Sequence, residues 1–250
     1  MAARLTTGVH RLGDDFVNFY VIEEGTDLTL VDGGLPAHYE QLTALLARLG
    51  RSIRDVRALL LTHSHLDHIG LAARVQAEAD AAVLAHPLDI PSLASPLKPT
   101  PEAKPEGSLV RALLRRPSAL RVPVYLARSG AFRTAGVTAV GELNGGATLD
   151  VPGRPKVVEM PGHTPGSVAF QLPDRGIVLT GDALVTDDRL AGRTGPTIVS
   201  SAFTHDTAEA LASLDALASL DADVILSGHG DPFEGDIADA VRLAREAGAR

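Results

Sequence analysis

The chain has 250 residues, of which 45% are hydrophobic, so it is long and apolar enough to build a sizeable core. It contains no cysteine, which excludes disulfides, thiolate metal ligands and a cysteine nucleophile. The formal net charge of −8 disfavours a nucleic-acid partner. We find no signal-peptide pattern and no apolar run of membrane-spanning length, so we expect a cytoplasmic protein without a membrane partner.

The first third of the chain is predicted to begin with three antiparallel strands and to continue with alternating helices and strands. Runs rich in β-branched and aromatic residues are separated by turns that contain Gly13 or Gly25. Leucines at helical spacing follow Pro36, and Gly50 ends that pattern. The predicted elements are strands over 9–12, 16–23, 27–31, 56–61 and 81–85, and helices over 36–49 and 70–79.

The segment 87–133 is rich in proline, and we expect it to be an insertion over the core. It should contain one short helix over 106–116, which Pro117 stops. Strand-like alternation resumes at Val137, with a hairpin turn expected at 144–146. The remaining predicted elements are strands over 156–160, 167–172, 176–180 and 223–226, and helices over 208–220 and 234–247.

Three histidines and an aspartate follow the strand predicted over 56–61. His63 and His65 are two residues apart, so in extended chain their side chains leave the same face. Asp67 and His68 come next, where a turn can bring them to the same point. Imidazole and carboxylate together suit a zinc-like divalent ion and leave room for water. The alternative is a polar turn after a buried strand, but three of the chain's nine histidines lie here.

Three later strands end in a common pattern, in which an apolar run is followed by glycine and then by a side chain that can bind a metal. These side chains are His163, Asp182 and His229. Glycine permits the sharp turn, and many α/β folds place their sites at strand ends. A capped turn would explain any one of the three. All three together with the first motif predict a metal centre.

The run His63-Ser64-His65-Leu66-Asp67-His68, with the three later residues, resembles the signature of the metallo-β-lactamase fold superfamily. The resemblance extends from Asp32 to His229. It implies an α/β fold of the αββα sandwich type, with two mixed β-sheets packed face to face and helices outside. We therefore expect residues 1–250 to form a single domain that carries an insertion, or lid, at about 87–133.

The resemblance also implies how the ligands would be divided between two metals. His63, His65 and His163 would hold one metal, and Asp67, His68 and His229 the second. Asp182 would bridge the two. The sequence by itself gives only the set of seven residues, and the division comes from the family.

The activity that the resemblance implies is metal-dependent hydrolysis. Two zinc ions, or iron or manganese in their place, would share a hydroxide that attacks a small ester-like substrate, with a thioester or lactone favoured. Asp67 and Asp182 would be the catalytic carboxylates, with Asp67 also able to handle a proton. A class B1 β-lactamase would carry cysteine in place of Asp182, so the glyoxalase II and lactonase-like branch fits better. Lactonases of that branch often have tyrosine where this chain has Val185.

Two other functions are alternatives. A mononuclear iron oxygenase similar to persulfide dioxygenases has the same fold, but its mark would be a defective second ligand set, and this chain has Asp67, His68 and His229. A non-catalytic descendant would bind a ligand or partner, yet it has no reason to keep seven metal ligands. The sequence leaves the native substrate, the metal and the oligomeric state open.

A further carboxylate and four further histidines have simpler interpretations. Asp32 ends an apolar strand, and by the resemblance it would orient a ligand histidine, although a plain turn aspartate is an equal alternative. The remaining histidines are expected at the surface and not as ligands, although two of them, His86 and His205, could line the pocket. The four are His10, His38, His86 and His205.

Basic residues are concentrated in the proline-rich segment. Residues 91–133 contain eight basic and two acidic residues, a net charge of +6 inside a chain of −8. One interpretation is a solvated face that pairs with the acidic remainder. The other is a lid whose field attracts an anionic small-molecule substrate, with Arg115 and Arg116 as candidate substrate-binding residues.

Overall fold

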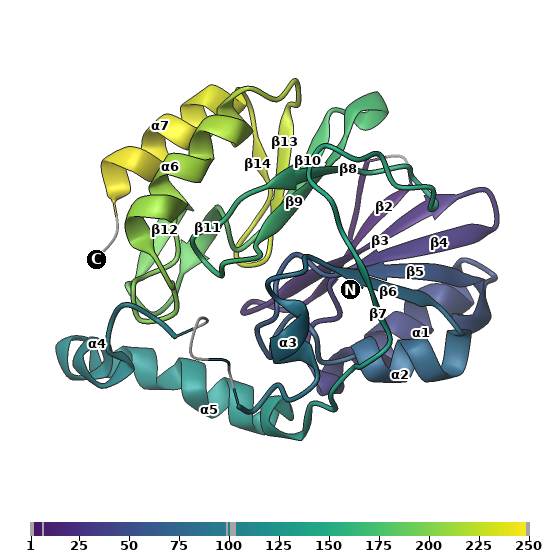
Figure 1. Cartoon of the computed structure of the whole chain (residues 1–250), viewed down its shortest axis with the longest axis horizontal. Helices are drawn as coiled ribbons and strands as arrows, with labels where there is room; N and C mark the ends of the chain where they lie inside the picture. The colour runs from purple at the N-terminus through teal and green to yellow at the C-terminus, as the bar shows by residue number, and fades with distance from the viewer. Residues whose placement is uncertain (1–2, 7, 99, 101–103, 249–250) are drawn as a thin grey trace.

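Two mixed β-sheets pack face to face in the computed structural model, which describes residues 3–6, 8–98, 100 and 104–248 (Figure 1). Leu60 of the first sheet and Phe170 and Leu226 of the second belong to one buried apolar cluster between the sheets. Burying a side chain of this size stabilises the fold by roughly 1.5–3 kcal/mol. This central layer therefore fixes how the two sheets face each other.

The first sheet joins an antiparallel half to a parallel half. Its strands follow sequence order from β1 to β7, antiparallel as far as β4 and parallel from β4 onwards. Because β4 and β5 are parallel, the residues after both strands emerge at the same edge. The strands are β1 (Ala3–Thr6), β2 (Val9–Gly13), β3 (Asn18–Glu24), β4 (Asp27–Val31), β5 (Val56–Leu60), β6 (Ala82–Ala85) and β7 (Val140–Glu142).

The second sheet has the order β14–β13–β10–β9–β8. Its β10 and β13 are parallel, and Gly181 at the end of one lies opposite Ser227 at the end of the other. The residues that follow these two strands are therefore neighbours. The strands are β8 (Lys156–Glu159), β9 (Val168–Leu172), β10 (Ile177–Gly181), β13 (Val224–Ser227) and β14 (Phe233–Glu234), and a separate hairpin consists of β11 (Val185–Asp188) and β12 (Arg193–Thr197).

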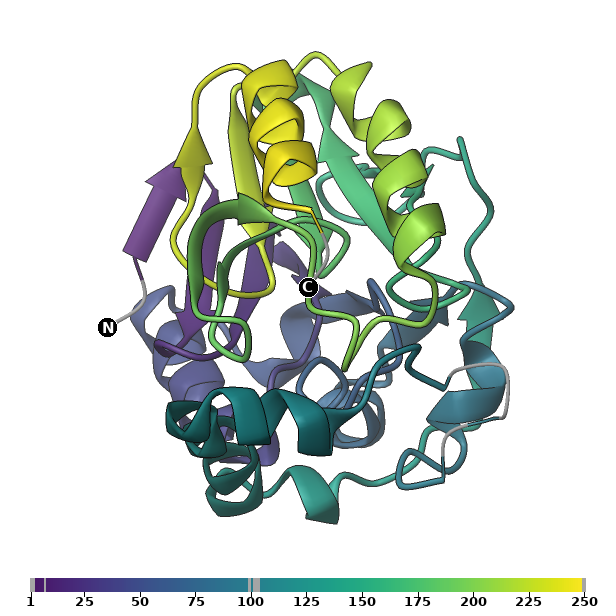
Figure 2. The ribbon, with the colours of Figure 1, turned by 90° about the vertical axis from the view of Figure 1, so that its left-hand side faces the viewer.

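Helices cover the outer face of each sheet (Figures 1 and 2). On the first sheet, α1 (Tyr39–Arg48) and α2 (Ala72–Ala79) contribute to one apolar cluster with strand residues. On the second sheet, α6 (Thr207–Ala218) and α7 (Ile237–Ala247) do the same. The αββα sandwich predicted from the sequence is confirmed.

The described part of the segment 87–133 contains the α-helices α3 (Ile90–Leu93), α4 (Leu109–Arg115) and α5 (Arg121–Arg128), and short 3₁₀ helices over Pro117–Leu120 and Ala131–Arg133. The predicted helix over 106–116 corresponds to α4. The sequence pattern does not predict α5 because Pro123 reads as a helix breaker. That proline stands in the first turn of α5, where a helix does not require its backbone N–H. The role of this segment as a lid stays a prediction.

Other differences from the predicted elements are local. The short strands β1, β11, β12 and β14 are not predicted, and β14 occupies the expected start of the last helix, which begins at Ile237 after its Asp236 cap. A turn is present at 144–147, where Ala147 N–H donates to the Asn144 carbonyl, but it joins the two sheets and is not a hairpin as expected. Leu143 N–H donates to Ala85 in the first sheet, whereas Gly146 N–H donates to Val157 in the second.

Among the described residues, no helix has the length and apolar character needed to cross a membrane.

Candidate metal centre

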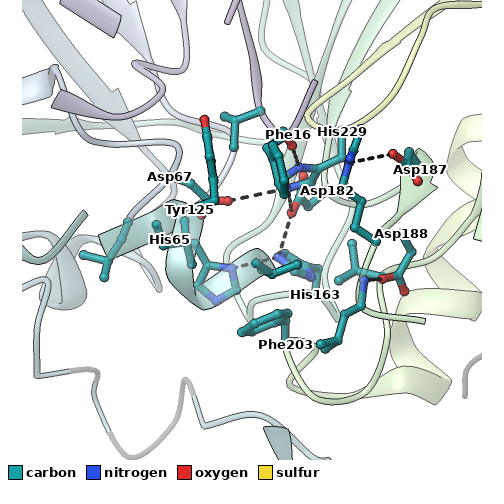
Figure 3. A pocket seen from close by; sticks show the side chains of 17 residues that line it. Phe16, His65, Asp67, Tyr125, His163, Asp182, Asp187, Asp188, Phe203 and His229 are labelled. Atoms are coloured by element: carbon teal, nitrogen blue, oxygen red, sulfur yellow. Dashed lines mark hydrogen bonds and ion pairs between the residues drawn. The ribbon is translucent and has the colours of Figure 1, made fainter. Parts of the chain in front are cut away.

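The candidate ligands follow four strands that end at one edge of the sandwich. In the first sheet β5 leads to His63 and His65, and in the second sheet β8, β10 and β13 lead to His163, Asp182 and His229. Figure 3 shows His65, His163, Asp182 and His229 directed toward a common region at the base of a cavity. The sandwich thus brings side chains that are distant in sequence to one place.

Glycines allow the strand ends to approach closely. Gly181 has a φ of +50°, in the left-handed region that glycine adopts without strain. A Cβ at Gly228 would lie 2.3 Å from Asp182 Oδ1 and 2.6 Å from His68 Cε1. Only glycine therefore fits at position 228 without displacing two candidate ligands.

The side-chain atoms form overlapping groups that could each hold an ion. Within each group the ligand atoms lie within 4.8 Å of one another. The groups are His63, His65 and His163; His63, His68 and Asp182; and Asp67, His68 and His229. The first and third groups are the two ligand sets that the resemblance implies.

Asp182 lies between these two sets. Its Oδ1 is 3.4 Å from His68 Nε2, and its Oδ2 is 3.0 Å from His229 Nε2 and 3.5 Å from His163 Nε2. Burial by itself would raise the pKa of Asp182, but His229 and His68 hold it well below its usual value. The buried side chain is therefore an ionised carboxylate in contact with both sets.

Three buried atoms in the cluster have no hydrogen-bond partner, namely His63 Nε2, His68 Nε2 and Asp182 Oδ1. Leaving a buried polar group unsatisfied costs about 1–3 kcal/mol, and more if it is charged. A cation in the cluster would satisfy all three atoms at once. Imidazole and carboxylate donors without thiolate match zinc, iron or manganese. The residues present therefore fit the metals that the fold family implies.

Among the candidate ligand histidines, some have a lowered pKa and others a raised pKa. Burial lowers the pKa of His63 and His163 well below the usual value, and neighbouring imidazoles lower it further. Burial also opposes protonation of His229, but the Asp182 carboxylate outweighs it and raises the pKa to about 10. His63 and His163 are thus held in the neutral form that a metal requires.

The outer nitrogens of two histidines are fixed through Asp32 and Thr62. Asp32 accepts a hydrogen bond from His68 Nδ1–H at 2.8 Å and another from the Thr62 hydroxyl at 2.8 Å. With its proton committed to Asp32, the Thr62 oxygen accepts from His63 Nδ1–H at 3.0 Å. Asp32 has a φ of +61°, a conformation that costs a non-glycine residue of order 1–3 kcal/mol. The arrangement leaves Nε2 of both histidines available to a metal.

The outer nitrogens of His163 and His229 are held by oxygen acceptors in the same way. His163 Nδ1 lies 3.4 Å from Thr204 Oγ1, which itself donates to the Val199 carbonyl at 2.9 Å. His229 Nδ1–H donates to the Phe16 carbonyl. These acceptors orient both rings with Nε2 toward the cluster.

Replacing Asp32 by Asn is expected to weaken metal binding. Asp32 Oδ2 accepts from His68 and from the Thr62 hydroxyl, while Oδ1 accepts from the Thr62 N–H at 2.8 Å. An amide group cannot accept at both positions, so the His68 and His63 rings lose the contacts that orient them. Losing an outer partner of this kind typically costs 10–100-fold in metal affinity or activity. Competition with a chromogenic chelator measures the affinity. Asp27→Asn is the control, because Asp27 contacts only an exposed arginine among the described residues, and an equal loss in both variants would contradict the role of Asp32.

Asp89 supports the loop that carries His163, and the sequence pattern does not identify it. Its buried carboxylate accepts the Thr164 hydroxyl at 2.8 Å and the Gly166 N–H at 2.9 Å. Both donors follow His163 closely in the chain. No local signal distinguishes Asp89 from other aspartates, because its partners lie in a distant segment.

The cavity above the cluster has mainly apolar walls. The Phe16 and Tyr125 rings stack with centroids 4.1 Å apart and an interplanar angle of 9°. Arg189 is the cationic residue of the wall, and its guanidinium lies 3.0 Å from the Asp187 carboxylate and over the Phe16 ring. The wall is completed by the following apolar residues: Val17, Leu66, Val122, Leu126, Leu190, Val199 and Phe203.

Several sequence-predicted residues lie away from this cavity. Arg115 and Arg116 are exposed on and after α4, and His205 contacts the Lys104 carbonyl at 3.0 Å. None of the three lines the cavity. His86 also lies outside the cavity wall, as one of the four further histidines. Two of those four, His10 and His38, were expected at the surface, and this is wrong, because both are buried and face acidic partners.

Tyr125 ties α5 to the rest of the protein. Its hydroxyl donates to Asp14 Oδ2 at 2.8 Å. Burial would raise the pKa of Asp14, but hydrogen bonds from His38, the Phe16 N–H and Tyr125 lower it to about 2. The acceptor is therefore ionised at neutral pH, which strengthens the link between α5 and the turn that carries Phe16.

We expect Tyr125→Phe to loosen α5 while keeping the ring stack on Phe16. The lost hydrogen bond should lower the free energy of unfolding by about 1 kcal/mol, and KM should rise because part of the cavity wall becomes less ordered. Thermal melting and steady-state kinetics measure the two effects. Tyr39→Phe removes a hydroxyl that bonds Glu78 away from the cavity. A KM change of the same size in that control would argue against the link.

The chain belongs to the metallo-β-lactamase superfamily, whose family model matches residues 12–229. It is a metal-dependent hydrolase of that superfamily. It is 28% identical to the probable metallo-hydrolase YflN of Bacillus subtilis over 91% of this chain and 86% of YflN.

Solved structures agree with this assignment. The metallo-β-lactamase family protein TTHA1429 from Thermus thermophilus is 27% identical, with a TM-score of 0.70 over 98% of this chain and 80% of TTHA1429. TTHA1623 in a di-iron-bound form is 26% identical, with a TM-score of 0.63 over 94% of this chain and 96% of TTHA1623.

Proposed function

We propose that this protein is a dinuclear hydrolase of a small ester-like substrate, with zinc as the metal. The observation that carries the proposal is the place of Asp182 between the two ligand sets, together with three partnerless buried atoms, one of which is its own Oδ1. One set would consist of His63, His65 and His163, and the other of Asp67, His68 and His229. Two metals held there would lower the pKa of a water molecule and stabilise negative charge on the substrate oxygen.

Asp67 is the carboxylate placed to handle a proton. It lines the cavity and is only partly buried, whereas Asp182 is almost wholly enclosed. Its Oδ2 lies 3.7 Å from His229 Nε2 and 4.0 Å from His68 Nε2. Asp67 can therefore serve as a ligand of the second set and exchange a proton with the cavity.

The cavity wall indicates the kind of substrate. Phe16, Leu66, Tyr125 and Phe203 offer apolar and aromatic contacts, which would enclose an acyl group and exclude water from it. The one arginine of the wall is already paired with an aspartate. The geometry therefore supports a thioester or lactone with an apolar acyl part, and any attraction of an anionic substrate would act at a distance.

The test combines metal analysis with a hydrolysis panel. Protein purified without added metal should contain about two equivalents of metal per chain, and it should hydrolyse thioesters or lactones in preference to phosphodiesters and a cephalosporin. The di-iron form of TTHA1623 is a reason to measure iron and manganese beside zinc. A content of one iron without zinc would instead favour a mononuclear oxygenase. Two metals without activity on any acyl substrate would contradict the proposed reaction.

A further inference from the structure

The surface of α4 and α5 exposes large apolar side chains. Among the described residues, all seven exposed large hydrophobic side chains lie between Leu88 and Phe132. Five of them belong to α4, α5 and the residues next to these helices, with exposed fractions from 47% for Val124 to 77% for Leu114. Large apolar side chains gathered in one exposed segment are typical of interaction surfaces in soluble proteins. The five are Val110, Leu114, Leu120, Val124 and Phe132.

The same segment is exclusively basic. Residues 108–133 contain six arginines and no aspartate, glutamate or lysine. All six are exposed, and none forms an ion pair with a carboxylate of the described residues. The interpretation that they pair with the acidic remainder of the chain is therefore not supported. The arginines are Arg111, Arg115, Arg116, Arg121, Arg128 and Arg133.

Helix α5 has apolar side chains on both of its sides. Val122, Tyr125 and Leu126 line the metal cavity, whereas Val124 is exposed to solvent. In Figures 1 and 2, α4 and α5 lie along one margin of the molecule, apart from the sheets. The side of α5 that faces away from the cavity thus combines the exposed Val124 with the exposed Arg121 and Arg128.

We propose that the α4–α5 surface, defined by the five apolar side chains and six arginines above, binds the surface of an anionic lipid bilayer. Arginines interleaved with leucine, valine and phenylalanine match the boundary between charged headgroups and acyl chains. The long arginine side chains can reach the headgroups while the apolar side chains enter the bilayer. The acidic remainder of the chain opposes this weakly, because salt screens charges beyond about 8–10 Å. The proposal departs from the sequence-based expectation of no membrane partner, which rested on the lack of apolar runs of spanning length.

Charge also decides between the bilayer and a second copy of the chain. A two-fold dimer through this surface would bring six arginines of one protomer against six of the other. Like charges facing each other across an interface are strongly unfavourable. An anionic surface removes this repulsion and covers the apolar side chains at the same time.

Flotation with lipid vesicles tests the proposal on the full chain. The protein should float with phosphatidylglycerol–phosphatidylcholine vesicles and not with phosphatidylcholine alone. Arg111→Gln combined with Arg121→Gln should reduce partitioning roughly thirtyfold, since each basic residue near an anionic surface contributes about fivefold. Leu114→Ser combined with Val124→Ser should reduce it as well. Arg48→Gln combined with Arg54→Gln removes the same charge from exposed positions elsewhere and should have little effect.

Circular dichroism and thermal melting show that each variant is folded. Absence of binding to anionic vesicles would overturn the proposal, and so would an equal loss in the Arg48 and Arg54 control. Sedimentation velocity tests whether a second copy of the chain binds this surface instead. A concentration-dependent dimer that Leu114→Ser with Val124→Ser abolishes, without vesicle binding, would assign the surface to a second copy of the chain.

Discussion

Asp182→Ala should reduce metal content from about two equivalents to fewer than one and lower kcat/KM by roughly 10³-fold or more. Asp182 contacts His163 of the first ligand set and His68 and His229 of the second. Without the negative charge of Asp182, two divalent ions held at these sites would repel each other with no carboxylate between them. Elemental analysis and steady-state kinetics measure the two losses.

Asp187→Asn is the matched control for this change. Asp187 lines the same cavity, but its carboxylate pairs with Arg189 at 3.0 Å and is in none of the three groups that could hold a metal. The control should keep its full metal content. If Asp182→Ala also kept two tightly bound metals and wild-type turnover, the bridging role would be wrong.

Chelation is expected to abolish activity and to lower thermal stability. The proposed reaction uses no nucleophile from the protein, and the chain has no cysteine to supply one. Metal that binds only the native state stabilises it by mass action, by about 2.7 kcal/mol at a free concentration of 100 times Kd. Its removal should therefore lower Tm, and Zn²⁺ or Mn²⁺ should restore both activity and Tm.

Chelator already saturated with Zn²⁺ is the control for this experiment, since it contains the same molecule without free binding capacity. It should leave activity and Tm unchanged. Activity that persists after prolonged chelation, with metal loss verified by elemental analysis, would exclude the proposed mechanism.

The sequence predicts most regular elements because their signals are local. The strand β4 was predicted with the bounds that the structure shows, and α1 and β5 differ from prediction only near their ends. Helix α5 is missed because a proline allowed in a first turn looks like a breaker in a linear pattern. The strand β14 is missed because two residues carry no periodicity, and β11 because the two aspartates at its end are typical of a turn and not of a strand.

The sequence by itself determined the candidate ligands, because each follows a strand end through a short motif that can be recognised without the fold. Asp32 was identified in the same way, although its contacts with His68 and Thr62 required the structure. These motifs are local, and the resemblance supplied the division of the ligands between two metals. His63 and His229 are examples of ligands that chemistry and position in the chain were sufficient to propose.

The surroundings of that cluster depend on contacts that form only in the folded chain. Tyr125 reaches Asp14 and stacks on Phe16, and Asp89 reaches the loop after His163, through contacts between segments far apart in the chain. Such contacts depend on how layers and the insertion pack, and no short-range pattern records them. For the same reason the sequence could count the arginines of the insertion but could not place Arg115 on the outer surface instead of in the cavity.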